Sequence, residues 1–180
     1  MPRSGVHREM DNLSVRLSQN LDRWFPELVR ALEHELFSGL RSLAGADAED
    51  LAQETFVRAY QALGSYPANR VATMSLRPWI WTIALNLGRN HRRALNRRPR
   101  AVELEDYGRP DPEPVDAVAW ETRLRKLSVP IRRAVVLRHV VGLDYDEIAT
   151  ALGRPLGTVK ADVHRGLDRL RTMMEEEDER

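Results

Sequence analysis

The chain has 180 residues and a formal net charge of +1, and 42% of its residues are apolar, which is typical of a folded globular protein. It contains no cysteine, so disulfide bonds, thiolate zinc sites and thiol redox sensors within the chain are excluded. No apolar run approaches the roughly 20 residues that span a bilayer, and the first residues lack the apolar core of a signal peptide, so we expect a cytoplasmic protein without stable membrane association.

Charge is strongly segregated along the chain although its sum is small. Seven arginines and no acid lie in residues 77–100, whereas six acids and one arginine lie in residues 101–119. A polyanion responds to the local field within about 10 Å at moderate salt. The basic segment therefore favours a nucleic-acid partner more than the net charge suggests.

The first predicted helix lies within residues 11–43. Apolar side chains recur at helical spacing from Leu21 to Leu40 and form one buried stripe. Pro26 is compatible with a helix only in the first turn, so we expect this helix to begin near Trp24.

Two further helices are predicted before residue 100. Asp47 is a good N-cap for a helix that runs to Leu63 and ends at Gly64. Residues 64–76 are rich in turn-forming residues and are expected to form a loop. Pro78 suits the first turn of a third helix, which continues to about residue 98.

The second half of the chain begins with a predicted linker. Residues 100–115 contain three prolines and show no periodicity, and so long a structureless stretch is unusual inside a domain. Helical patterns follow at 116–127, 131–141, 144–152 and about 156–174. The last six residues, EEEDER, are expected to form a frayed tail. The sequence therefore predicts an all-α fold of two small helical domains, 11–99 and 116–174, joined by a flexible acidic, proline-rich linker at 100–115.

The sharpest local signal is a helix-turn-helix motif in residues 144–171. Asp144 and Glu147 have the spacing of a capping box, and Gly153 lies where the chain must turn. Val159 is the expected apolar anchor of the following helix. The inward-facing residues of the helix before the turn are expected to be Ile148, Ala149 and Leu152.

In such a motif the second helix enters the major groove and its early residues meet base edges. The exposed candidates are Thr158, Lys160, Ala161, His164 and Arg165, with Arg169 and Arg171 nearer the backbone. A helical bundle with a merely solvated basic face is the alternative interpretation.

The predicted helix at 47–63 begins with an acidic cluster. Acids near a helix N-terminus are favoured by the helix dipole, which explains some of them. A protein-docking surface is the other interpretation, and the residues themselves leave both open.

The third helix combines tryptophans with a basic face. Arginines along it could follow a phosphate backbone, and aromatic side chains beside them could stack on single-stranded bases. Trp79 is expected to be mainly structural, whereas Trp81 suits either role.

Three segments carry a family resemblance. DAEDLAQETFVRAY, PWIWTIALNLGRNHRR and LSVPIRRAVVLRHVVGLDYDEIATALGRPLGTVKADVHRGLDRLR closely resemble bacterial sigma factors of the extracytoplasmic-function group of the sigma-70 family. The resemblance covers about residues 21–174. It implies that the first domain binds the β′ clamp helices of the RNA polymerase core and recognises and melts the −10 element. It also implies that the second domain binds the β flap and the −35 element.

The resemblance assigns residues to each of these roles. Polymerase contact is expected from Asp47, Glu49, Asp50, Leu51, Gln53, Glu54 and Arg58. The −10 DNA is expected to contact Tyr66, Asn69, Arg70, Trp81, Asn86, Arg89, Arg92 and Arg93, with a flipped base held by the loop at 66–75 and Asn86. The −35 DNA is expected to contact Thr158, Lys160, His164, Arg165 and Arg169.

The sequence departs from its relatives at a few positions. Ala161 and Asp162 stand where many relatives have Ser-Arg, and an acid there would repel phosphate or select a cytosine, predicting an unusual −35 sequence. Gly166 is expected to loosen the recognition helix by up to about 1 kcal/mol relative to alanine. Trp81 stands where tyrosine is commoner.

Parts of the sequence are also compatible with other functions. A regulator that binds an operator through the helix-turn-helix would show salt-resistant specific binding by the isolated protein. An adaptor would use the acidic helix but leave the basic helix without a role. No catalytic residues, metal ligands or cofactors are expected, because the five histidines are scattered and no phosphate-binding loop is present. The resemblance also implies an anti-sigma factor as a partner.

Overall fold

The computed structural model describes the backbone of residues 5–97 and 115–178, and these ranges contain helices and no strand. The predicted all-α fold is confirmed. The first body comprises α1 (Gly5–Gln19), α2 (Leu21–Ala44), α3 (Ala48–Ser65), α4 (Ala68–Ala72) and α5 (Leu76–Arg97). The second comprises α6 (Val115–Lys126), α7 (Val129–His139), α8 (Tyr145–Leu152) and α9 (Leu156–Asp178). The predicted linker at 100–115 lies outside the described residues except for its last residue, which begins α6.

Asn20 separates helix α1 from helix α2. The side chain of Asn20 accepts a hydrogen bond from the backbone N–H of Arg23 at 3.0 Å, so it caps the N-terminus of α2. The prediction that this helix begins near Trp24 was therefore wrong, and Pro26 lies inside it. Near the helix start the ring removes one backbone hydrogen bond, which the cap and the buried stripe of α2 outweigh.

The region between α2 and α5 also differs from the expectation. Asp47 precedes α3 as predicted, but its side chain makes no capping hydrogen bond. The helix continues through Gly64 to Ser65. Part of the expected loop forms the short helix α4, whose Val71 is buried in the core of the first body. These boundaries depend on tertiary packing that local turn residues do not report.

The four helices of the second body match the predicted segments closely, apart from the C-terminal tail. Helix α9 continues to Asp178 instead of fraying after residue 174. The carboxylate of Glu177 lies 2.5 Å from Arg123 and 3.8 Å from Lys126. These ion pairs with α6 account for the extra helical turn.

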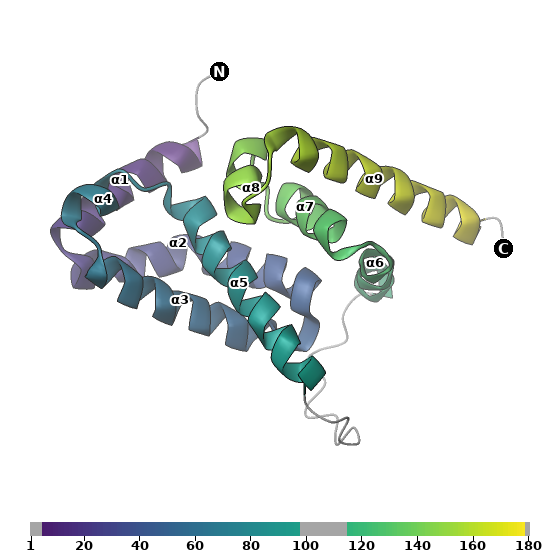
Figure 1. Ribbon diagram of the computed structural model, residues 1–180, viewed down its shortest axis with the longest axis horizontal. Helices are drawn as coiled ribbons and strands as arrows, with labels where there is room; N and C mark the ends of the chain where they lie inside the picture. The colour runs from purple at the N-terminus through teal and green to yellow at the C-terminus, as the bar shows by residue number, and fades with distance from the viewer. Residues whose placement is uncertain (1–4, 98–114, 179–180) are drawn as a thin grey trace.

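The two bodies lie against each other, with α5 facing α8 and α2 facing α7 (Figure 1). Trp81 on α5 is only 1% exposed and packs beside Gly39 of α2, which is also adjacent to Val141, the second residue after α7. A Cβ at Gly39 would lie 2.4 Å from the Trp81 ring and 2.6 Å from Val141. Glycine is therefore required for this close approach.

Arg77 at the start of α5 ties the two bodies together. Its guanidinium group lies 2.8 Å from the carboxylate of Glu35 on α2 and 3.2 Å from that of Glu147 on α8. It also donates to the carbonyl oxygen of Val141 at 2.8 Å. Glu35 accepts a further hydrogen bond from the indole N–H of Trp81 at 3.0 Å. The contact between the bodies is thus apolar at Trp81 and ionic beside it.

Candidate nucleic-acid interface

The helix-turn-helix formed by α8 and α9 has the local geometry that the sequence predicts. The backbone N–H of Glu147 donates to the Asp144 side chain at 2.8 Å, and the N–H of Asp144 donates to the Glu147 side chain at 2.9 Å. Gly153 adopts the left-handed conformation, with φ 62° and ψ 40°. Val159 is fully buried. The capping box, the turn and the anchor of the motif are confirmed.

The packing of α8 differs in one detail. Ile148 is fully buried as expected, but Ala149 and Leu152 are only partly buried. Ala151 is the small residue that lies in the core, at 6% exposure. The helix is therefore rotated slightly relative to the expected inward face.

Helix α9 presents a basic surface to solvent. Lys160, His164 and Arg165 follow one another at helical spacing on its exposed face, and the side chains of His164 and Arg165 are 80% and 60% exposed. Arg169 is also exposed, whereas Thr158 is half-buried. Four of the five predicted −35 residues are thus accessible along the helix that a major groove would accept.

Asp162 does not belong to this surface. Its carboxylate is 3% exposed and forms ion pairs with Arg154 and, at 2.6 Å, with Arg165. The expectation that it repels phosphate or selects a cytosine was wrong, because the side chain points into the domain. Its effect on DNA is indirect, since it holds Arg165 in place.

Gly166 also has a different role from the one expected. A Cβ at this position would lie 2.3 Å from a methyl group of Val135 and 2.9 Å from one of Ile131. Glycine here allows α7 and α9 to pack closely, and the gain in packing opposes the loss of helix propensity.

The first body has a hollow of about 250 Å³ beside α5. Aromatic and amide side chains meet there: the Tyr66 and Trp79 rings lie edge to face, 6.2 Å apart, and Asn86 and Asn90 line the same space. The Arg70 guanidinium stacks over Tyr66 at 3.7 Å. The arrangement offers a stacking surface and hydrogen-bonding edges, which an unstacked base requires.

The predicted −10 residues therefore separate into two groups. Tyr66, Arg70 and Asn86 lie at or beside the hollow, and Asn69 is exposed on α4, where its side chain accepts from the Arg70 N–H. Trp79, which was expected to be mainly structural, also lines it.

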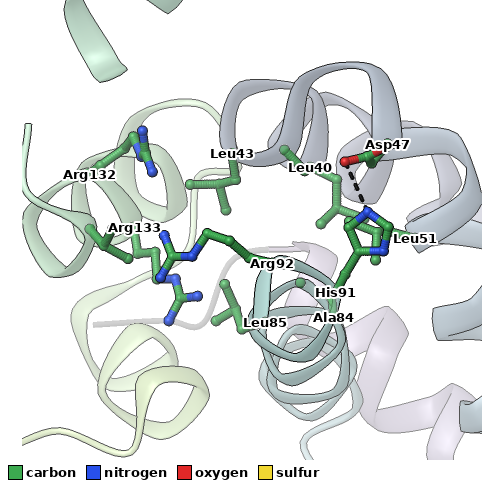
Figure 2. Close-up of a pocket in the computed structure, with 13 residues that line it drawn as sticks. Leu40, Leu43, Asp47, Leu51, Ala84, Leu85, His91, Arg92, Arg132 and Arg133 are labelled. Carbon is green, nitrogen blue, oxygen red and sulfur yellow. Dashed lines mark ion pairs between the residues drawn. The ribbon is translucent and has the colours of Figure 1, made fainter. Parts of the chain in front are cut away.

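The remaining −10 residues lie elsewhere along α5. Trp81 is enclosed between the two bodies, so a contact with DNA through its ring requires them to separate. Arg89, Arg92 and Arg93 are exposed, and Arg92 lines a second cavity that faces the second body (Figure 2).

The predicted polymerase surface lies on the first turns of α3. Glu49, Asp50, Gln53 and Arg58 are exposed, whereas Leu51 is buried at 6%. Glu54 pairs with Arg58 at 2.6 Å, and Gln53 donates to Glu49 at 3.4 Å. Asp47 lies apart from them and pairs with His91 at 3.1 Å.

An exposed aromatic residue extends this surface along α3. Tyr60 is 41% exposed, and its hydroxyl group donates to Asp22 at 2.6 Å. This hydrogen bond and the negative charge of Asp22 raise the pKa of Tyr60 above its usual value. The ring also packs edge to face on Phe25, 5.1 Å away. The sequence placed Tyr60 on the apolar surface of this helix but not among the residues predicted to contact polymerase, although its position two turns after Gln53 could have indicated it.

Sequence reasoning also missed the contacts between the two bodies. Arg77 is one of seven arginines in its segment, and nothing in the local pattern distinguishes it from those that face solvent. Within residues 5–97 and 115–178, no helix is long and apolar enough to cross a membrane, and no group of three metal-ligating side chains is gathered together.

Comparisons with known families match both halves of the chain. Residues 28–98 match the family model of sigma-70 region 2, and residues 117–170 match that of sigma-70 region 4. The RNA polymerase sigma-H factor of Pseudomonas aeruginosa is 29% identical, over 88% of this chain and 90% of the relative. The sigma-E factor of Escherichia coli is 28% identical, over 85% and 87%. The sigma factor SigE of Mycolicibacterium smegmatis is 34% identical, over 81% of this chain and 59% of the relative.

Solved structures share the fold. CnrH, determined in complex with the cytosolic domain of CnrY, superposes with a TM-score of 0.71 at 24% identity, over 92% of this chain and 97% of that one. RpoE of Bartonella quintana, determined in complex with the anti-sigma factor NepR, superposes with a TM-score of 0.66 at 23% identity, over 84% and 96%.

Proposed function

The chain belongs to the extracytoplasmic-function group of the sigma-70 family, and on that premise we propose that it binds the bacterial RNA polymerase core and directs it to promoters. The observation that carries this function is the presence, in one chain, of both family regions in the expected order. Each region has its own candidate DNA surface, the hollow beside α5 and the exposed face of α9.

Residues 11–99 are the proposed unit for polymerase and the −10 element. The exposed acids of α3, with Asp50 among them, supply charge to a polymerase surface. The hollow lined by Tyr66, Trp79 and Asn86 accepts an unstacked −10 base. Stacking and amide hydrogen bonds offset part of the few kcal/mol that unstacking costs.

Residues 116–174 are the proposed unit for the −35 element. Lys160, His164 and Arg165 lie on the face of α9 that enters the major groove, and Arg169 contacts the adjacent backbone. Asp162 orients Arg165 from beneath, so that its guanidinium group is positioned before DNA binds.

Promoter binding requires the two bodies to separate. The names of the two elements place them about 25 base pairs apart, which is roughly 85 Å along a straight duplex at 3.4 Å per base pair. In the structure, by contrast, Arg77 of the first body contacts Glu147 of the second directly. We propose that this closed arrangement belongs to the free protein and that polymerase stabilises an open one.

Two further proposals follow from family membership. An anti-sigma factor is a proposed partner that holds the protein away from polymerase. The cytoplasm is the proposed location, because the polymerase core is found there.

A binding experiment separates this function from that of an operator-binding regulator. Fluorescence anisotropy of a labelled promoter fragment would be measured with this protein alone, with core polymerase alone, and with both, across a range of salt concentrations. A sigma factor predicts weak, salt-sensitive binding alone and tight, sequence-specific binding only with core polymerase. Tight, salt-resistant binding by the protein alone would instead support the regulator.

A further inference from the structure

A cavity of about 140 Å³ lies at the contact between the two bodies, apart from the −10 hollow beside Tyr66 and the exposed face of α9, although it shares Arg92 with the predicted −10 residues. Its floor is apolar and is formed mainly by leucines and an alanine of α2 and α5, namely Leu40, Leu43, Ala84 and Leu85. Its edge is basic: Arg92 comes from α5, and Arg132 and Arg133 come from α7 (Figure 2). Because the arginines come from both bodies, the site is complete only in the closed arrangement.

The arginines of this cavity have no anionic partner among the described residues. Arg92, Arg132 and Arg133 form no ion pair with an acid in those ranges, and neither does the adjacent Arg89. Asp47, the acidic side chain that lines the cavity, is already paired with His91 at 3.1 Å. The Nε atom of Arg132 is buried and donates to no acceptor. A buried donor without an acceptor is costly and points to a missing ligand.

The guanidinium groups are also close enough to repel one another. Burial lowers the pKa of Arg133, and the positive charges of Arg89, Arg92 and Arg132 lower it further. Burial likewise lowers the pKa of Arg132, with contributions from Arg92 and Arg125. The side chains nonetheless remain charged at neutral pH, because a guanidinium group is not deprotonated in proteins. Closure therefore gathers positive charge that an anion would neutralise.

We propose that this cavity binds a phosphate-bearing small molecule, with the guanidinium groups of Arg92, Arg132 and Arg133 on the phosphate oxygens. The planar donors of arginine match phosphate oxygens in pairs, and three of them suit a multivalent anion better than a single carboxylate. The leucine floor suits an organic group attached to the phosphate. A cavity of this size accepts a phosphate with a small organic group but no nucleic-acid duplex.

The site links ligand binding to the arrangement of the two bodies. A ligand that contacts both α5 and α7 binds the closed arrangement and not the open one, so it shifts the population towards closure. This binding is independent of the proposed promoter function and can be measured without polymerase.

Isothermal titration calorimetry on the full chain tests the proposal, with inorganic pyrophosphate and phenyl phosphate as probes and sodium chloride at matched ionic strength as the control. Saturable binding at one site per chain is expected for at least one probe. Arg133→Gln and Arg92→Gln should each weaken it by about tenfold or more. The matched variant Arg30→Gln, an exposed arginine of α2 that pairs with Glu27, should bind as the unaltered chain does.

Two further measurements distinguish a ligand site from a merely structural arginine. Without ligand, Arg133→Gln should raise the melting temperature, because it removes a repelling charge. The ligand should raise the melting temperature of the unaltered chain but not that of Arg133→Gln. The absence of native cysteine allows dye pairs at Val57→Cys and Met174→Cys, two exposed positions on different bodies, to report closure by energy transfer.

Energy transfer should increase when the ligand is added. Binding of pyrophosphate without binding of phenyl phosphate would overturn the role of the leucine floor and assign the site to inorganic phosphate. Absence of saturable binding at millimolar concentrations, unchanged affinity in Arg133→Gln, or an equal response to sodium chloride would each overturn the proposal.

Discussion

The Nη1 atom of Arg77 lies 3.2 Å from Oε2 of Glu147, and this contact joins helix α5 of the first body to helix α8 of the second. Both side chains are about 90% buried. Each helix belongs to a different proposed DNA-binding unit. The ion pair therefore holds together two units that must separate before both can bind a promoter. Its strength determines how readily the free protein opens.

Replacing Arg77 by methionine should open the molecule. The change leaves Glu35 and Glu147 without their shared cation in a nearly buried position, which costs about 3–5 kcal/mol of the free energy of unfolding. Urea denaturation measures this loss, and small-angle X-ray scattering measures the expected increase in radius of gyration. Arg30→Met removes an exposed arginine with an i,i+3 pair and should change unfolding by less than about 1 kcal/mol. Equal effects of the two variants would contradict the role of Arg77.

Gly166→Ala should destabilise the second body despite the better helix propensity of alanine. The new methyl group would lie 2.3 Å from Val135, and overpacking of this kind costs about 1–3 kcal/mol. Gly157→Ala in the same helix is the matched control, because its Cβ would meet no atom within 4 Å. Thermal denaturation should show opposite signs, a lower melting temperature for the first variant and an equal or higher one for the second.

Asp162→Asn should lower stability and weaken −35 binding, because Arg165 is no longer held in position. The buried carboxylate holds Arg154 and Arg165, and loss of its charge weakens both pairs by about 3 kcal/mol in total. Asp168→Asn alters an acid of the same helix that is 49% exposed, and it should cost less than about 1 kcal/mol. Denaturation and binding to a panel of −35 variants measure the two properties. A changed base preference without lost stability would place Asp162 on the DNA surface after all.

Much of the second body could be predicted because its signals are local. The capping box joins Asp144 to Glu147, three residues away, and Gly153 ends its own helix. In contrast, Arg77 pairs with Glu35 and Glu147, which are 42 and 70 residues away along the sequence. No periodicity carries information about such contacts, so the closed arrangement could not be predicted.

The errors at the candidate sites have a related cause. The sequence identifies Asp162 as an acid in a recognition helix but does not fix the rotation of that helix, so its burial was missed. Trp79 and Trp81 are two residues apart and therefore lie on different sides of α5. Only the packing of the second body decides that Trp81 is the enclosed one.

Asp50→Arg should prevent binding to core polymerase while the helical content stays intact. Asp50 is exposed and forms no ion pair or side-chain hydrogen bond with the residues that the structure describes, so reversal of its charge acts on the partner surface. Loss of about 2 kcal/mol or more of binding free energy is expected, measured by anisotropy of the labelled protein with core polymerase. Glu33→Arg makes the same charge reversal at an exposed position on α2 outside the proposed surface. Binding by Asp50→Arg equal to that of Glu33→Arg would remove Asp50 from the polymerase contact.

Run-off transcription tests the central claim most directly. Sigma-free bacterial core polymerase would transcribe pooled genomic promoter fragments with and without this protein, and the transcript starts would be mapped. If the protein is a sigma factor, discrete start sites appear only when it is present, and they share −35 and −10 sequences upstream. Unchanged transcription by core polymerase, together with binding of the protein alone to a discrete duplex site, would contradict it.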